Sequence, residues 1–188
     1  LYVACISKSE VNMNKILLIL CLVFLVSCSQ KEVTYDQTIW RQELLYEVNS
    51  TTPFTGVIVE HYDNGELSSS INVKDGKVEG LSELYYDNGQ LERKEAYKYG
   101  LKHGESLTFY DNGQVRVKVT YKYGLQHGEF LEFYDNGQLS VRDYRKDDKV
   151  EGLYEIYYDN GQLEEKGSYE DGRKYQQGPT YNKYGTIK

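Results

Sequence analysis

Hydrophobic and polar positions alternate with a period of two in runs of about six to eight residues, and each run stops at a turn signal such as Asn-Gly or Asp-Gly. This period places successive side chains on opposite faces, which is typical of β-strands. After Cys28, a weak helical spacing occurs at residues 37–45. The pattern therefore predicts an all-β fold of about ten short strands.

The turn signals return at a fixed interval, which indicates a repeat architecture. Asp-Asn-Gly begins at five positions that lie 24 residues apart: Asp63, Asp87, Asp111, Asp135 and Asp159. A unit of this length holds two strands and two turns, and such units stack mainly on their neighbours. We predict an elongated antiparallel β-meander of 24-residue β-hairpin repeats over residues 53–188, with five repeats and a shorter C-terminal cap.

The Asn-Gly pair in each unit predicts the tight turn of a hairpin. Type I′ turns need positive φ at both central residues, and Asn-Gly suits them best. With this pair at the centre, Tyr86 faces Leu91 and Gly80 faces Tyr97. The residues expected to form the turns and hold the strands together are Tyr86, Asn88, Gly89, Tyr110, Asn112, Gly113, Tyr134, Asn136, Gly137, Tyr158, Asn160 and Gly161.

Two aromatic columns precede the Asp-Asn-Gly turns. The residue before each Asp is always Tyr, and the residue before that Tyr always carries a ring. Strand alternation places the invariant Tyr with Leu91 and Tyr97 on one face, and the mixed rings with Lys94 on the other. Aromatic side chains supply rigid contact area and are enriched at interfaces. The candidate interaction surface is therefore formed by Tyr85, Phe109, Phe133 and Tyr157.

The N-terminal segment has the features of a secretory signal. Lys15 precedes eleven apolar residues from Ile16 to Val26, which are too few to span a bilayer as a helix and suit a signal peptide. The run Leu25–Cys28 resembles the bacterial lipobox, in which the cysteine receives a lipid. We predict a spurious extension at residues 1–12, a lipoprotein signal peptide at 13–27, and a lipidated N-terminus with a spacer and a capping strand at 28–52.

Lipid attachment at Cys28 predicts that the protein is localised at the bacterial cell envelope, on the outer membrane if the cell is Gram-negative. The residue directly after Cys28 is Ser29, whereas an aspartate at this position favours inner-membrane retention in lipoproteins of some Gram-negative bacteria. The other cysteines, Cys5 and Cys21, precede the predicted cleavage site, so no disulfide framework is expected. With 22 basic and 29 acidic residues the chain is not expected to bind nucleic acid. Its membrane contact should depend on the lipid rather than on basic side chains.

The sequence shows no motif for catalysis, a cofactor or a metal. His103 and His127 occupy the same column, but two strand spacings put them about 10 Å apart, too far to share one ion. Asp-Asn-Gly lacks the alternating ligands and the distal glutamate of a calcium loop. No nucleophile or phosphate-loop motif occurs. We therefore expect a protein without enzymatic activity, cofactor or metal.

The repeated units resemble the bacterial variant of the MORN repeat, whose members are often labelled antitoxin components of the YwqK type. The segment Tyr85–Leu91, the run His103-Gly104-Glu105 and the Lys-Asp-Gly turns carry the resemblance. It covers residues 53–188. It implies a scaffold for protein or membrane interaction and no reaction.

Three functions are compatible with 20 tyrosines in this pattern. The first is a membrane-anchored scaffold that mediates protein–protein interaction. The second is a carbohydrate-binding or cell-wall-binding module, because Tyr-Tyr-Asp-Asn-Gly is similar to the repeats of choline- and glucan-binding modules, although the single tryptophan, Trp40, lies outside the repeats. The third is an antitoxin or immunity protein that binds a toxin, which the export signal restricts to a secreted toxin.

Overall fold

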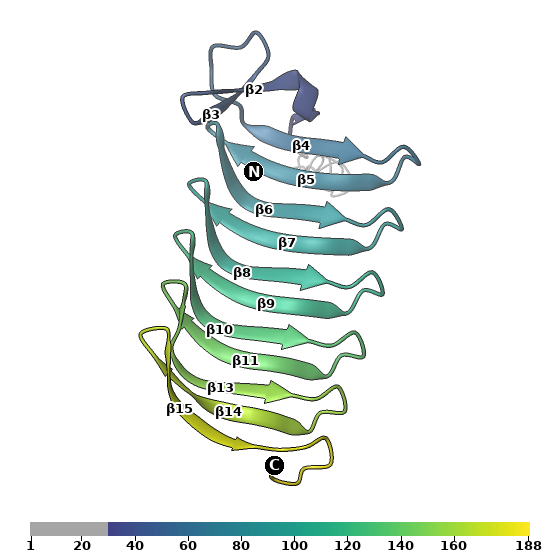
Figure 1. Cartoon of the computed structure of the whole chain (residues 1–188). Helices are drawn as coiled ribbons and strands as arrows, with labels where there is room; N and C mark the ends of the chain where they lie inside the picture. Colours follow the sequence, from purple (N-terminus) through teal and green to yellow (C-terminus); the bar gives the residue numbers. More distant parts are fainter. Residues whose placement is uncertain (1–29) are drawn as a thin grey trace, which may run out of the picture. The chain divides into compact units, whose positions relative to one another are not determined.

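The computed structural model describes residues 30–188, which form a long curved sheet with a small N-terminal cap (Figure 1). The predicted extension, the signal peptide and Cys28 lie outside the described residues. Residues 30–188 contain no α-helix, and therefore no helix there is long and apolar enough to cross a membrane.

The sheet is an antiparallel meander from β4 onward, in which each strand pairs with the strands before and after it in the sequence. Its strands are β4 (Gly56–His61), β5 (Leu67–Lys74), β6 (Lys77–Tyr85), β7 (Leu91–Lys98), β8 (Leu101–Phe109), β9 (Val115–Lys122), β10 (Leu125–Phe133), β11 (Leu139–Lys146), β12 (Lys149–Val150), β13 (Gly152–Tyr157), β14 (Leu163–Glu170) and β15 (Arg173–Thr180). β12 and β13 both pair with β11 and together take the place of one strand. The predicted all-β meander of 24-residue hairpins is confirmed.

The Asp-Asn-Gly turns along one edge of the sheet are not type I′ turns. Of residues 86–90, Gly89 alone has a positive φ, of 80°. The N–H of Gly89 donates to the carbonyl of Tyr86 at 2.9 Å, and the N–H of Tyr86 donates to the carbonyl of Gln90 at 2.8 Å. This is a three-residue loop made of a type I turn and a left-handed glycine. The predicted pairing is therefore wrong next to the turn, where Tyr85 faces Leu91 and Tyr86 does not.

A bulge in the following strand compensates for the longer loop. Glu92 has no partner in the register of β7 with β6, and beyond it the pairing is the one predicted, with Gly80 opposite Tyr97. Such a bulge adds one residue to one strand of a pair. The same shift recurs in the later hairpins. The different turn type thus changes the register only next to the loop.

Type I′ turns occur at the opposite edge, where the chain passes from one hairpin to the next. Asp75 and Gly76 have φ values of 49° and 78°. Asp147 and Asp148 have φ values of 50° and 68°. Asp148 thus takes the place of glycine, because aspartate enters the left-handed region more readily than most residues.

Each hairpin bends close to its type I′ turn. Gly104 has a φ of 104°, and there the pairing of β7 with β8 slips by two residues, from Glu95 opposite Ser106 to Tyr97 opposite Lys102. Extra residues on one strand of a pair bend that strand. Figure 1 shows the strands curving at the left edge of the sheet, where these turns lie. The sheet therefore has an inner and an outer face.

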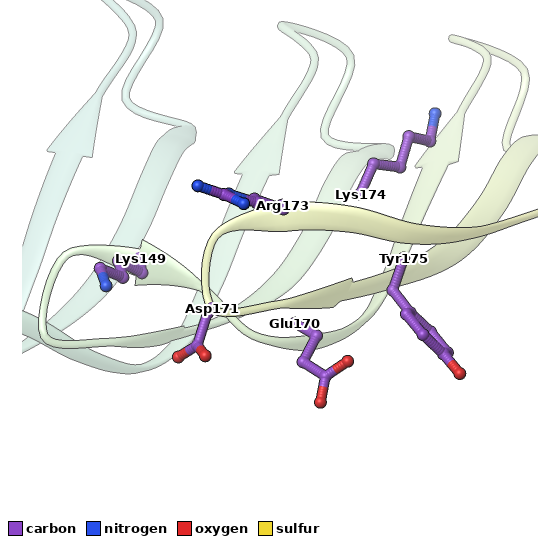
Figure 2. A pocket seen from close by; sticks show the side chains of 6 residues that line it. All are labelled: Lys149, Glu170, Asp171, Arg173, Lys174 and Tyr175. Carbon is purple, nitrogen blue, oxygen red and sulfur yellow. The ribbon is translucent and has the colours of Figure 1, made fainter.

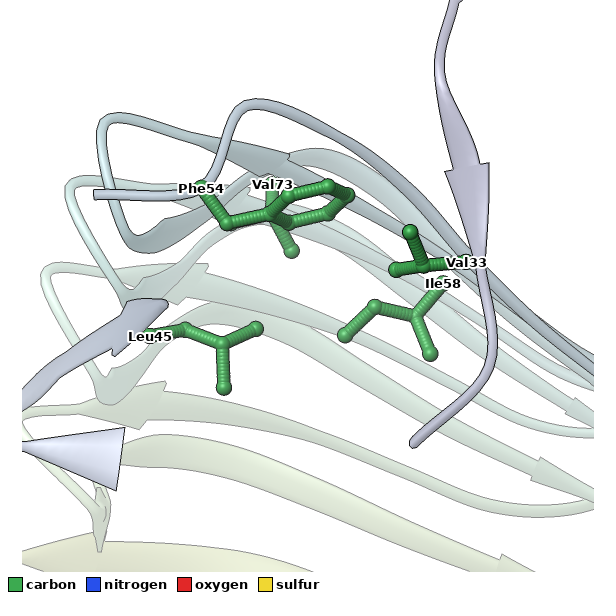
Figure 3. Packing of buried hydrophobic residues seen from close by; sticks show 5 residues of the cluster. All are labelled: Val33, Leu45, Phe54, Ile58 and Val73. Atoms are coloured by element: carbon green, nitrogen blue, oxygen red, sulfur yellow. The ribbon is translucent and has the colours of Figure 1, made fainter. Parts of the chain in front are cut away.

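The cap precedes the meander and supplies the apolar core. β1 (Glu32–Val33) pairs in parallel with β4, and η1 (Tyr35–Gln37), β2 (Thr38–Arg41) and β3 (Leu44–Glu47) follow it. Five buried hydrophobic residues pack together here (Figure 3): Val33, Leu45, Phe54, Ile58 and Val73. The weak helical spacing of residues 37–45 does not produce an α-helix, because strand pairing between β2 and β3 satisfies the backbone there instead.

Beyond the cap cluster, the buried side chains share one face of the sheet. They are Ser69, Glu95, Ser106, Val119, Asp143 and Tyr154. No second layer packs on this part of the sheet within residues 30–188. The burial therefore comes from the curvature of the sheet itself, and we call this face the inner face.

Candidate interaction surface

Four pairs of side chains lie side by side on the outer face. Each candidate ring faces an aliphatic residue of the neighbouring strand: Tyr85 with Leu91, Phe109 with Val115, Phe133 with Leu139 and Tyr157 with Leu163. All eight side chains are half-buried. Consecutive rings are two strand spacings apart, about 10 Å. The structure thus aligns the four predicted rings in one row, the ring row, and places Leu91 in that row rather than beside Tyr86.

Ion pairs flank the ring row on the outer face. They join Lys94 to Glu83 (3.1 Å), Lys118 to Glu105, and Arg142 to Glu129 (3.3 Å). Exposed pairs of this kind contribute only about 0–1 kcal/mol to stability. Their effect on the surface is to match the cations with carboxylates, so that the apolar row is bordered by paired charges.

The first and last rings of the row, Tyr85 and Tyr157, carry hydroxyls that face carboxylates. The hydroxyl of Tyr85 donates to Glu83 at 3.0 Å, and that of Tyr157 donates to Glu155 at 2.8 Å. Burial, followed by these hydrogen bonds, raises the pKa of both tyrosines above the ordinary value. The two middle rings belong to phenylalanines. The centre of the ring row is therefore its most apolar part.

The invariant tyrosines connect each repeat to the next one. The hydroxyl of Tyr86 donates to the carbonyl of Phe109 at 2.8 Å. The same bond joins Tyr62 to Tyr85 (2.5 Å), Tyr110 to Phe133 (2.8 Å), Tyr134 to Tyr157 (2.7 Å) and Tyr158 to Tyr181 (2.9 Å). Each hydroxyl thus binds the backbone of the following hairpin. We call this series of bonds the tyrosine ladder.

The turn asparagines form a second series of bonds parallel to the tyrosine ladder. Oδ1 of Asn88 accepts the N–H of Gln90 at 2.9 Å, while its Nδ2 donates to the carbonyl of Asp111 at 3.2 Å. Bonds of the second kind also join Asn64 to Asp87 (3.0 Å), Asn112 to Asp135 (3.1 Å), Asn136 to Asp159 (2.7 Å) and Asn160 to Lys183 (2.9 Å). One asparagine therefore shapes its own turn and binds the next turn.

The inner face carries buried polar groups that are paired with each other. Glu95 accepts hydrogen bonds from the Tyr97 hydroxyl at 2.9 Å and from the Lys102 ammonium at 2.6 Å. Burial, ahead of the bond to Glu95, raises the pKa of Tyr97 far above the ordinary value. Asp143 accepts two bonds from the Arg145 guanidinium, at 2.9 and 3.2 Å. No buried side-chain nitrogen or oxygen in residues 30–188 lacks a partner, so these groups stabilise the bend.

A hollow of about 590 Å³ lies near the last type I′ turn (Figure 2). Lys149, Glu170, Asp171, Arg173, Lys174 and Tyr175 line it. In Figure 2 these side chains point in different directions, with Lys174 directed away from Glu170 and Asp171. A catalytic site requires groups that converge on one reacting atom. The hollow does not show that arrangement.

The two histidines of the repeat column have separate contacts. The ring centre of His103 lies 4.8 Å from that of Tyr123, and Nδ1 of His127 lies 3.2 Å from Asp147. Across the part of the chain that the structure describes, no three side chains of His, Cys, Asp or Glu are placed to hold a metal ion.

Sequence reasoning missed one surface feature at the type I′ turns. Tyr99 and Tyr123 occupy the first central position of two of these turns and are exposed. The signal was present, because Lys-Tyr-Gly-Leu occurs at both residues 98–101 and residues 122–125.

The geometry agrees with a known repeat family. The family model described as the MORN repeat variant matches four consecutive segments, residues 78–99, 102–123, 126–147 and 150–171. Each segment starts after one type I′ turn, contains one Asp-Asn-Gly turn and ends at the next type I′ turn. One match therefore corresponds to one hairpin with its connecting residues. No curated protein matches the chain.

Proposed function

Residues 78–171 are four tandem MORN repeat variants, and from this premise we propose that the chain is a non-catalytic scaffold that binds a protein partner at the bacterial cell envelope. Repeats of this family form non-catalytic scaffolds that generally serve protein or membrane interactions. In our proposal the ring row is the binding surface, and a lipid on Cys28 holds the scaffold at the membrane.

The observation that carries the proposal is the ring row itself. Its rings are half-buried on an outer face that no other element covers within residues 30–188. A partner that covers such a row removes apolar surface from water, which is favourable by about 25 cal/mol per Å². Phenylalanine and tyrosine are also enriched in protein interfaces. The even spacing of the rings suits a partner that extends across several repeats.

The membrane-anchored part of the proposal depends on the residues before the described region. Lys15, the apolar run Ile16–Val26 and the lipobox-like run Leu25–Cys28 support it. Two or more acyl chains anchor a protein stably, whereas a single chain binds only marginally. A multiply acylated Cys28 is therefore sufficient for attachment without any basic patch.

A pair of substitutions in the most apolar part of the ring row tests the interaction. We expect Phe109→Ser with Phe133→Ser to reduce partner crosslinking in intact cells at least tenfold, with a small change in thermal unfolding. The matched control is Ile39→Ser with Trp40→Ser, which removes two exposed apolar side chains of the cap (43% and 57% exposed). Crosslinking should use a photoreactive residue placed at Val115, inside the ring row.

Three results would contradict the proposed binding surface. Equal crosslinking by both double variants would show that the ring row does not bind. Collapse of the thermal transition in the first variant would show that the rings are core. Retention of the wild-type chain on purified peptidoglycan or glucan, lost in the first variant, would assign the rings to a carbohydrate instead.

A separate experiment tests the lipid anchor. Cells supplied with a clickable fatty acid should label the wild-type chain, and Cys28→Ser should abolish the label and release the protein from the membrane fraction. Cys21→Ser serves as the control, because Cys21 lies inside the apolar run and should not change labelling. Labelling that persists in Cys28→Ser would overturn the assignment of the lipid site.

A further inference from the structure

Five type I′ turns join successive hairpins in the described residues, and their side chains fall into two groups. The first central residue has a φ between 49° and 55° in all five turns. In three turns this residue is Asp, and the residue two positions later is basic: Asp75 with Lys77, Asp147 with Lys149, and Asp171 with Arg173. In the two middle turns the same positions hold Tyr99 with Leu101 and Tyr123 with Leu125.

The turn geometry does not explain these tyrosines. The left-handed region is unfavourable for a bulky residue, whereas aspartate enters it readily. Tyr99 and Tyr123 are 65% and 54% exposed, and Leu101 and Leu125 are 48% and 43% exposed. Side chains that remain this exposed gain little free energy from burial on folding. The other three turns adopt the same backbone with charged residues, so folding does not require the apolar ones.

The four side chains form one continuous surface, which we call the tip patch. Cδ2 of Leu101 lies 3.6 Å from the position that a Cβ on Gly124 would occupy, so Leu101 reaches the neighbouring turn. The tyrosines flank this contact, and the Nζ of Lys98 lies 5.5 Å from the ring centre of Tyr99. Leu101 and Phe109 are the two ends of β8, eight residues apart, which corresponds to about 26 Å along the strand at 3.3 Å per residue. The tip patch is therefore separate from the ring row.

The two segments that form the tip patch carry lysines and no acidic residues, although the chain is acidic and Lys102 is paired with Glu95. Residues 96–104 and 120–128 contain no aspartate or glutamate, and their lysines are Lys98, Lys102 and Lys122. The whole chain has a net charge of −7. Two carboxylates at the border of the patch bind backbone groups: Glu79 accepts the N–H of Tyr99 at 2.6 Å, and Asp148 accepts the N–H of Gln126 at 2.8 Å. An approaching partner therefore meets apolar side chains next to Lys98 and Lys122, for which the described residues show no ion pair.

The width of the tip patch indicates what can cover it. The apolar part spans two turns, about 10 Å, which matches the diameter of one helix or one extended segment. On either side the same edge carries aspartates, at Asp75 and at Asp147-Asp148. Each of these turns also holds lysines, Lys77 or Lys149 among them, so a flat bilayer laid along this edge would have to desolvate both signs of charge without gaining apolar contact there. A single protein segment can contact the patch and avoid them.

We propose that the tip patch is a second docking site, which binds one short segment of a protein partner that carries apolar side chains next to carboxylates. The apolar side chains pack against the exposed tyrosines and leucines, and the carboxylates pair with Lys98 and Lys122. Opposite charges at the border of such a contact determine specificity and the rate of association more than affinity. This site is independent of the ring row.

The chain supplies its own matched variant for a test. Tyr99→Asp, Leu101→Lys, Tyr123→Asp and Leu125→Lys together install the residues that the chain already holds at its other type I′ turns. The fold should therefore be retained, which circular dichroism and thermal unfolding can verify. The probe is a displayed library of random 12-residue peptides, selected in parallel on the wild-type chain, on the fourfold variant and on Phe109→Ser with Phe133→Ser.

We expect the wild-type chain and the ring-row variant to enrich peptides that combine large apolar residues with Asp or Glu, and the fourfold variant to lose that enrichment at least tenfold. Enriched peptides should lose binding when their acidic residues are replaced by amides. Equal enrichment on all three chains, or enrichment of basic peptides, would overturn the proposal.

Two further measurements separate the other possible occupants. Binding to vesicles of phosphatidylcholine and phosphatidylglycerol that disappears in the fourfold variant would assign the patch to a membrane and overturn the proposal. A dimer detected by analytical ultracentrifugation and lost in the same variant would assign it to a second copy of the chain and would equally overturn it. Wild-type protein that stays monomeric and off the vesicles supports the protein segment.

Discussion

The cap and the repeat array reach stability by different means. In the cap, Leu45 is 1% exposed and packs with four other hydrophobic residues, as in an ordinary globular core. In the array, by contrast, most of the buried inner-face side chains are polar, and the buried hydrophobic ones are Val119 and Tyr154. Side chains of each hairpin also bind the backbone of the next one. The cap thus relies on apolar burial, and the array relies on directional bonds repeated at every junction.

This difference explains how a single-layer sheet can leave its outer face uncovered. Burial of a large apolar surface needs a second layer or a closed body, and the array has neither within residues 30–188. A hydrogen bond contributes about 0.5–1.5 kcal/mol, and two ladders supply two such bonds at each junction. The outer face is therefore not required for a core, and its apolar residues are available for contact with other molecules.

Truncation in the cap should have the largest effect. Leu45→Ala removes a fully buried side chain and is expected to lower the free energy of unfolding of the cap by about 2–5 kcal/mol. Hydrogen exchange should accelerate in β1, β3 and β4 and stay slow in β9–β11, because repeats contact mainly their neighbours. Leu153→Ala is the control, since Leu153 is 77% exposed. Faster exchange throughout the sheet would show that cap and array unfold as one unit.

Removing a buried carboxylate from the inner face should have an intermediate effect. Asp143→Ala leaves the Arg145 guanidinium with its Phe130 ring contact at 4.1 Å and its bond to Gln126 at 3.0 Å. We expect a loss of about 1–3 kcal/mol in denaturant unfolding, because the arginine loses its charged partner. Glu129→Ala, which removes an exposed partner of Arg142, should cost less than about 1 kcal/mol. Equal costs would contradict a specific role of the inner face.

Single bonds of the tyrosine ladder should have the smallest effect. Tyr110→Phe removes one hydroxyl and should cost about 0.5–1.5 kcal/mol in denaturant unfolding. Tyr134→Phe affects a different junction, so the double variant should show roughly the sum of the two losses. Tyr99→Phe is the control on an exposed tip. A ladder without energetic value would give three indistinguishable unfolding curves.

The repeat spacing predicted most of the fold, because its turn residues are readable locally. The 24-residue interval and the alternation led to the meander and to the four residues of the ring row. The turn types were not predictable in this way. Asn-Gly suits a type I′ turn as well as the observed loop, in which the N–H of Gln90 donates to Oδ1 of Asn88. That hydrogen bond depends on the three-dimensional form of the loop and could not be predicted from the sequence.

The burial on the inner face and the packing of the cap cluster were not predictable from the sequence, for a related reason. The burial of Glu95 and Asp143 depends on the two-residue slip near Gly104, which recurs at the junctions β5–β6, β9–β10 and β11–β13. The glycines at the positions equivalent to Gly104 can be recognised in the sequence, but the number of extra residues in each bulge cannot. The cap cluster joins Val33, Leu45, Phe54 and residues of the first hairpin, which share no sequence period.

The tyrosine ladder makes the array tolerant to one kind of change in its gene and intolerant to another. Each hydroxyl meets a carbonyl 23 residues further along the chain, for example Tyr86 with Phe109. Duplication or loss of a whole 24-residue unit leaves every donor opposite an acceptor. A shift of one residue within a unit would misalign the junctions around it. The length of the exposed surface can therefore evolve in increments of about 10 Å, the width of two strands, without redesign of the remaining units.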